Sequence, residues 1–177
     1  MHADDRLHQP ESTETARAVL RRLVATLAYR AAKVLRDVPP GFDARTFGGA
    51  TRRPVQILAH MAYLMAWAIT TARGEPTWKA GGIDDWNLEM TRFFDGLAAL
   101  DQKLAADGPF AGSVDQLIQG PLADALTHVG QLAMLRGMAG HPVMPESYAR
   151  AKIVAGRVGP DQAAAVREFE GDASVRR

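Results

Sequence analysis

The chain has 177 residues, a formal net charge of +1, 47% hydrophobic and 23% charged residues, and no cysteine. This length and composition fit a single globular domain over residues 1–177 with a buried core. The near-neutral charge gives no electrostatic argument for binding nucleic acid or a membrane surface. The absence of cysteine excludes disulfides, thiolate zinc sites, iron–sulfur clusters and a cysteine nucleophile.

No export or membrane signal is evident in the sequence. The N-terminal run MHADDRLHQPESTETA contains acidic residues and no apolar core, unlike a signal peptide. The most apolar stretch, Ile57 to Ile69, is shorter than the roughly 20 residues that a bilayer span needs. We therefore expect a cytoplasmic protein that does not enter a membrane, with flexible ends at about residues 1–11 and 171–177.

The first predicted helix runs from about Ser12 to Asp37 and ends before Pro39-Pro40. Its apolar residues recur every three or four positions, as on one face of a helix. They are Leu20, Leu23, Leu27, Ala31 and Val34. Arginine and lysine occupy much of the remaining surface, but acidic residues flank them and no aromatic residues are interleaved. This pattern favours a solvated helix face over a nucleic-acid interface.

Two further helices follow. The second begins near Pro54, which the first turn of a helix tolerates, and continues to Gly74. A Gly- and Pro-containing loop leads to the third, which Asp84 or Asp85 can cap and which Gly108-Pro109 ends. The apolar residues of the third helix alternate steps of four and three, the spacing of a bundle seam. They are Trp86, Met90, Phe93, Leu97, Leu100 and Leu104.

The fourth helix restarts at Pro121, after a short helical turn in SVDQLIQG, and ends at Gly140. A further short helix is predicted over about Asp161 to Phe169. Four amphipathic segments without β-type alternation predict an all-α fold, a four-helix bundle with a short C-terminal helical extension.

Missing motifs exclude several kinds of site. The sequence has no GxxxxGK[ST] phosphate loop, no GxSxG nucleophile elbow and no HExxH zinc motif. No Glu is followed three residues later by His, so a ferritin-like di-iron site is excluded as well.

Three polar residues on apolar helix faces remain as candidates. His60 lies on the stripe of Ile57, Leu64 and Trp67, while Asp124 and His128 are one turn apart on the fourth helix. Residues four apart share a helix face, so the Asp and His of an Asp–xxx–His pair can coordinate one metal ion. Together the three would form a two-histidine, one-carboxylate metal site with open positions for water or substrate.

The alternative is a hydrogen-bonded Asp–His network that only fixes helix register. A buried Asp is costly unless it is paired or coordinated, which favours the metal site. The other histidines are weaker candidates, because His141 follows the predicted helix end and His2 and His8 lie near the N-terminus.

The runs PVQILAHMAYL and DALTHVGQLAMLRGMAGHPV resemble the DinB/YfiT-like superfamily of metalloenzymes, which is unrelated to the polymerase sharing the name DinB. The resemblance extends from the first helix to about Gly156. Family members place one ligand His early on the second helix and an HxxxH pair on the fourth, followed by GQ and then LR and G. Here these ligand positions fall on His60, Asp124 and His128.

Asp124 departs from this pattern, since the commoner residue there is His. An Asp adds negative charge, which shifts the preference toward harder ions or marks a degenerate, weakly binding site. The GQ and LR elements are present as Gly130-Gln131 and Leu135-Arg136.

The resemblance implies a variant of the up-and-down four-helix bundle, often a homodimer, holding a divalent ion such as nickel or zinc. Manganese and iron are further options for the metal. Characterised relatives include transferases and isomerases that use the low-molecular-weight thiols mycothiol, bacillithiol or glutathione, and some hydrolases. We expect a metal that activates such a thiol or a water toward a small-molecule substrate, without nucleic acid or membrane partners.

The alternative function is a non-catalytic, stress-associated bundle that binds a metal or small ligand without turnover. Tyr63 and Trp67, one and two turns beyond His60, are candidates to line a pocket, and Gln131 to orient a bound group. Packing is the competing interpretation for these three residues, and the one we favour for Trp67.

Overall fold

The computed structural model describes residues 10–49, 52–108 and 110–169. Within them the chain forms four long helices: α1 (Pro10–Leu35), α2 (Pro54–Ala72), α3 (Trp86–Ala105) and α5 (Ala123–Met138). Between α3 and α5 lie the short α4 (Val114–Leu117) and the π-helical turn η2 (Ile118–Leu122), and a 3₁₀ turn, η3 (Tyr148–Arg150), follows α5. The described residues contain no strand, only an isolated bridge between Glu146 and Glu168, so the fold is all-α.

The predicted helices are present, with ends that differ by a few residues. Asp85, rather than Asp84, caps α3, where its side chain accepts a hydrogen bond from the Leu88 amide. Pro54 occupies the first turn of α2 as predicted. The expected flexible ends lie outside the described residues, except that α1 already begins at Pro10.

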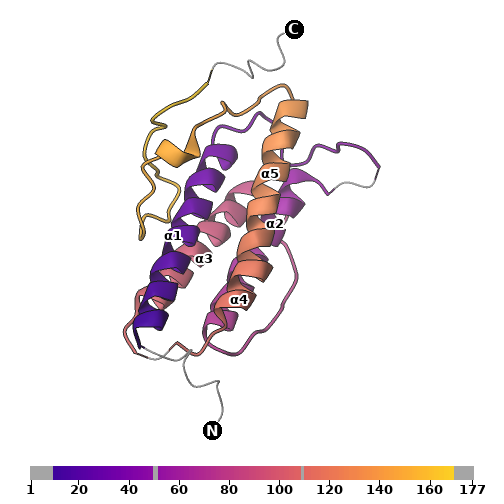
Figure 1. The fold of residues 1–177 in the computed structure, drawn as a ribbon. Helices are drawn as coiled ribbons and strands as arrows, with labels where there is room; N and C mark the ends of the chain where they lie inside the picture. The colour runs from indigo at the N-terminus through magenta and orange to yellow at the C-terminus, as the bar shows by residue number, and fades with distance from the viewer. Residues whose placement is uncertain (1–9, 50–51, 109, 170–177) are drawn as a thin grey trace.

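The long helices lie side by side, α1 and α5 running in one direction and α2 and α3 in the other (Figure 1). Arg17, in the first third of α1, donates hydrogen bonds to the carbonyls of Ala106 and Gly108, which directly follow α3. Arg53 and Asp84, which precede α2 and α3, form an ion pair with each other. The connection over residues 73–85 therefore returns the chain to the end at which α2 began, and makes α2 and α3 parallel.

The core is built from the inward faces of all four long helices. α2 is the most apolar of the four long helices. It has the length and composition to cross a membrane, with a mean hydropathy of 1.3 over its most apolar window. However, 61% of that window is buried inside the molecule, and the core helix of a globular protein passes the same test.

The chain kinks within η2, just before α5 begins. Gly120 leaves helical geometry, with φ −91° and ψ −106°, and Pro121 follows it. Proline cannot donate a backbone hydrogen bond, which accounts for the widened turn here. A Cβ at Gly120 would lie only 2.9 Å from the ring of Trp67 on α2. The glycine therefore lets the start of α5 approach α2 closely.

The C-terminal prediction was wrong, because residues 161–169 form no helix. The segment after α5 instead lies along α1, as the yellow trace in Figure 1 shows. Glu146 and Glu168 converge on Lys33 of α1, with Nζ–O distances of 2.8 and 2.6 Å. Tyr29 Oη also donates to Glu146, at 2.6 Å. The segment therefore takes its polar partners from α1 rather than from its own helical turns.

The same cluster corrects the interpretation of the basic face of α1. Lys33 was expected in solvent, but it is buried. Burial by itself lowers the pKa of Lys33, but its hydrogen bonds to Glu146 and Glu168 outweigh burial and leave the pKa raised. The cation is thus part of the protein interior.

Arg136 of α5 contacts the same, C-terminal end of α1 at which Lys33 lies. Its buried guanidinium donates to the carbonyls of Val34, Arg36 and Asp37, at 2.7 to 3.2 Å. These carbonyls lie at the C-terminal end of α1, where helical partners run out. The arginine of the LR motif therefore ties the ends of α5 and α1 together.

Candidate metal centre

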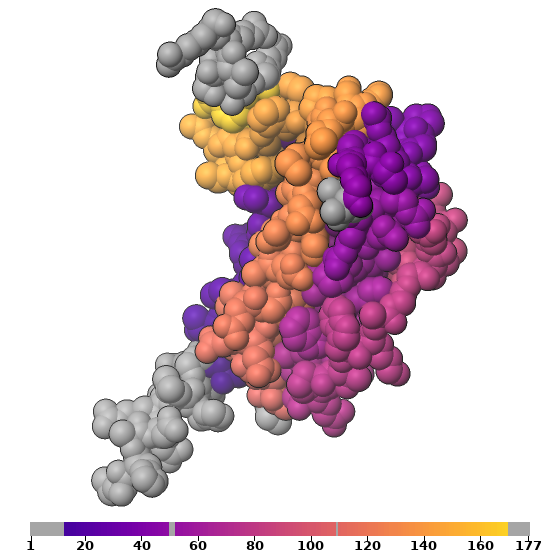
Figure 2. All heavy atoms as spheres, turned by 90° about the vertical axis from the view of Figure 1, so that its right-hand side faces the viewer, coloured from indigo at the N-terminus to yellow at the C-terminus, as the bar shows by residue number. Residues whose placement is uncertain are grey.

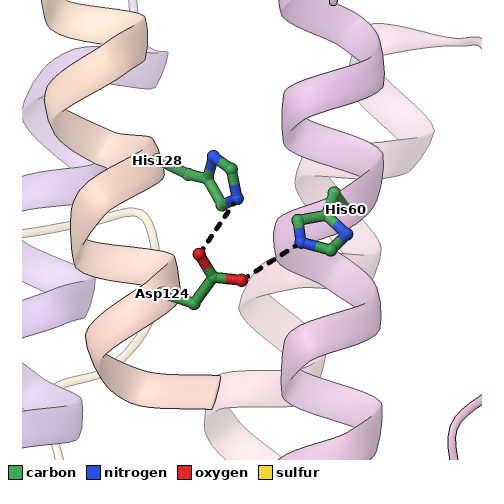
Figure 3. A group of neighbouring side chains, drawn as sticks. All are labelled: His60, Asp124 and His128. Atoms are coloured by element: carbon green, nitrogen blue, oxygen red, sulfur yellow. Dashed lines mark hydrogen bonds and ion pairs between the residues drawn. The ribbon is translucent and has the colours of Figure 1, made fainter. Parts of the chain in front are cut away.

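His60, Asp124 and His128 meet between two helices, as Figure 3 shows. His60 projects from the middle of α2, while Asp124 and His128 project from successive turns of α5. Because the kink at Gly120 brings the start of α5 close to α2, the first turns of α5 face His60. The three residues predicted from spacing are therefore neighbours in the folded chain.

The carboxylate of Asp124 lies between the two imidazoles. Its Oδ2 is 3.2 Å from His60 Nε2, and its Oδ1 is 3.3 Å from His128 Nε2. One ligand atom from each residue falls within 4.8 Å of the others. Neighbouring ligands of an ion with bonds of about 2.1 Å lie roughly 3 to 3.5 Å apart, so this group could hold a metal ion.

The centre is closed on one side and open on the other. The side chain of His128 is 9% exposed and that of His60 is 21% exposed, whereas Asp124 is 45% exposed. The sequence argument that a buried Asp needs a cation therefore loses force, because this carboxylate is half in water. The open side would leave positions on a bound ion for water or a ligand.

Burial lowers the pKa of His60, an effect that its hydrogen bond to Asp124 opposes and that the nearby His128 and Arg52 reinforce. A lowered pKa keeps the ring neutral at physiological pH. The neutral imidazole is the form that binds a metal ion.

Gln131 positions His128. Its side-chain Oε1 accepts a hydrogen bond from His128 Nδ1 at 2.8 Å, one turn along α5. With the proton on Nδ1, the lone pair of Nε2 faces the Asp124 oxygen 3.3 Å away. Two lone pairs at that distance repel each other unless a metal ion or a second ring proton lies between them, so the donor set could hold a metal ion. The sequence predicts that Gln131 orients a bound group. In the structure Gln131 contacts His128, one of the residues proposed to coordinate the metal.

An aromatic wall borders His60. Trp78, from the connection between α2 and α3, makes an edge contact with the His60 ring at 5.7 Å between centroids. Tyr63 and Trp67 contact the same indole at 6.3 and 5.7 Å. Trp78 was missed by the sequence analysis, although a lone tryptophan in a Gly- and Pro-containing loop was a signal that could have found it.

Two hollows flank the centre. One, of about 440 Å³, is lined by His60, Tyr63 and polar residues that include Arg52 and Arg53. The other, of about 340 Å³, is lined by His128, Gln131, Arg52 and apolar side chains. Tyr63 lines the first hollow, whereas Trp67 lines neither hollow and packs against Trp78 and Gly120.

Arg52 was also missed, because nothing in the sequence shows that it lies beside the histidines. His141 is exposed beyond the end of α5 and stays apart from the centre, as expected.

Comparison with models of protein families, with curated proteins and with solved structures found no match to the chain.

Proposed function

We propose that the chain is a four-helix bundle of the DinB/YfiT-like kind that binds one divalent metal ion through His60, Asp124 and His128. The observation that carries the proposal is the convergence of two imidazoles and one carboxylate from two helices, with one side open. The long connection that makes α2 and α3 parallel supports a variant of the up-and-down bundle.

We further propose that the protein is a metal-dependent enzyme of the thiol-dependent transferase, isomerase or hydrolase type. A divalent ion in this centre would lower the pKa of a bound thiol or water, so that thiolate or hydroxide forms near neutral pH. The chain itself supplies the ligands, the His128–Gln131 hydrogen bond that sets the ring orientation, and hollows on both sides for small molecules. Nickel or zinc is the proposed ion, with manganese or iron favoured if the Asp124 carboxylate dominates.

The second candidate is a non-catalytic bundle. Asp124 lies within 3.2 and 3.3 Å of both imidazoles with no ion between them, which is also the geometry of an Asp–His hydrogen-bond network. Such a bundle would bind a metal or small ligand without turnover, or would bind none.

Elemental analysis tests the proposal. The full chain is purified without affinity tag or chelator and analysed before and after incubation with nickel, zinc or manganese. We expect about one equivalent of metal, lost in His60→Ala and His128→Ala but kept in His141→Ala, with unchanged helical circular dichroism in all three. Full occupancy in His128→Ala would refute the ligand assignment, and no metal in the wild type would favour the Asp–His network. A homodimer, also proposed from the resemblance, is checked by light scattering on the same samples.

A further inference from the structure

Arg52 is common to the two hollows that flank the proposed metal centre. It lies just before α2 and lines the hollow beside His60 as well as the hollow beside His128. Figure 2 shows the face on which the purple segment preceding α2 lies beside the orange α5. A single guanidinium is thus placed at both entrances to the centre.

The charge of Arg52 is not neutralised by the described part of the chain. Its neighbour Arg53 forms an ion pair with Asp84, at 2.9 Å, but no carboxylate among the described residues pairs with Arg52. Around the centre, Asp124 would offset one charge of a bound divalent ion, and Arg52 would add another positive charge. The site would therefore attract an anion.

The hollow beside His128 adds a second property. Apart from Arg52, His128 and Gln131, its lining is apolar: Ile57, Met134 and Leu135. Met134, a large apolar side chain of the hollow that His128 also lines, is 60% exposed. An apolar surface with one guanidinium at its edge fits a ligand that is apolar over most of its length and carries one negative group.

We propose that the site binds a small organic carboxylate, with its carboxylate on Arg52 and its apolar body against Ile57, Met134 and Leu135. This rests on the proposed function, since it names the ligand class of the same centre. Arginine recognises carboxylates through two parallel N–H donors, and one unpaired guanidinium matches one monoanion.

The test uses three probes on the zinc-loaded full chain by isothermal titration calorimetry. Hexanoate has both the charge and the apolar body, acetate has only the charge, and hexanamide has only the body. We expect hexanoate to bind about tenfold more tightly than either. Arg52→Gln should lower hexanoate affinity to that of hexanamide without changing zinc content. Met134→Gln should lower hexanoate affinity but leave acetate binding unchanged.

Arg73→Gln is the matched control, because Arg73 is an exposed arginine at the opposite end of α2. It should bind hexanoate like the wild type. Equal hexanoate affinity in Arg52→Gln and wild type, or no preference for hexanoate over acetate, would overturn the inference.

Failure of the metal proposal is recognised separately. If the wild type takes up no zinc, the same titrations are run on the metal-free chain. Hexanoate binding that is lost in Arg52→Gln would then support the carboxylate site while the metal proposal fails. No hexanoate binding to that chain would overturn the inference as well.

Discussion

The side chain of Gln131 decides which nitrogen of His128 faces the centre. Its Oε1 accepts from His128 Nδ1 at 2.8 Å, which leaves Nε2 toward Asp124 and His60. Contacts of this kind to the second nitrogen of a ligand histidine fix its tautomer and ring orientation.

We predict that Gln131→Ala weakens metal binding by about tenfold or more, because His128 loses the acceptor that holds its ring. The helical signal should not change, since Gln131 is exposed. Competition with a chelator of known affinity measures the loss. Gln102→Ala, at an exposed glutamine of α3, is the control and should bind metal like the wild type.

The lowered pKa of His60 predicts a pH dependence of stability in the metal-free protein. The unfolded chain takes up a proton on this ring below about pH 6.5, whereas the folded chain takes it up only at lower pH. Because the unfolded state then binds more protons, the free energy of unfolding should decrease as the pH falls below about 6.5.

Urea unfolding between pH 7.5 and 5 checks this dependence. His60→Gln should show a shallower loss of stability than the wild type over that range. His141→Gln, at an exposed histidine outside the centre, should follow the wild type. An identical pH slope in His60→Gln would show that this ring contributes nothing to it.

At the scale of elements, the close approach of α2 and α3 depends on one glycine. A Cβ at Gly96 of α3 would lie 2.6 Å from the Cβ of Met65 on α2, a separation that real side chains do not adopt. The two helices must therefore move apart if this position carries any larger residue.

We predict that Gly96→Ala destabilises the protein by about 1 to 3 kcal/mol, despite the better helix propensity of alanine. Gly137→Ala is the matched control: it also lies in a helix, but nothing stands within 4 Å of its Cβ position. That variant should be as stable as the wild type or slightly more so. Thermal unfolding measures the stability of both variants. Equal stability of Gly96→Ala and Gly137→Ala would show that the packing of α2 against α3 does not depend on a glycine at position 96.

At the scale of the whole molecule, the segment after α5 is held to α1 by charges. Lys33 bridges Glu146 and Glu168, and Glu146 is fully buried at its side chain. Residues more than a hundred positions apart are thus joined through one ammonium group.

We predict that Lys33→Met costs about 3 kcal/mol of folding free energy, because it leaves the Glu146 carboxylate buried without its cation. The double variant Lys33→Met/Glu146→Leu should recover most of this loss, since the uncompensated charge is removed as well. Urea unfolding measures both. No recovery in the double variant would show that the loss came from packing rather than from charge.

Local sequence signals were enough to predict the four long helices. Pro54, Asp85 and the apolar spacing of the third helix predicted elements that the structure contains, because capping and helical periodicity act over a few residues. The same local logic failed at residues 161–169 and at Lys33. In both places the partner lies far away in the chain, and no short-range pattern reports it.

The sequence by itself determined the all-α fold class and nominated His60, Asp124 and His128, since helical spacing alone puts Asp124 and His128 on one face. Only the tertiary structure decided that His60 meets them, because the kink at Gly120 and the packing of α5 against α2 set that distance. It also decided that Asp124 is half exposed and that Arg52 stands at both entrances. The exposure of a side chain and its distance from residues far away in the sequence depend on how whole helices pack together. The sequence of one helix does not determine that packing.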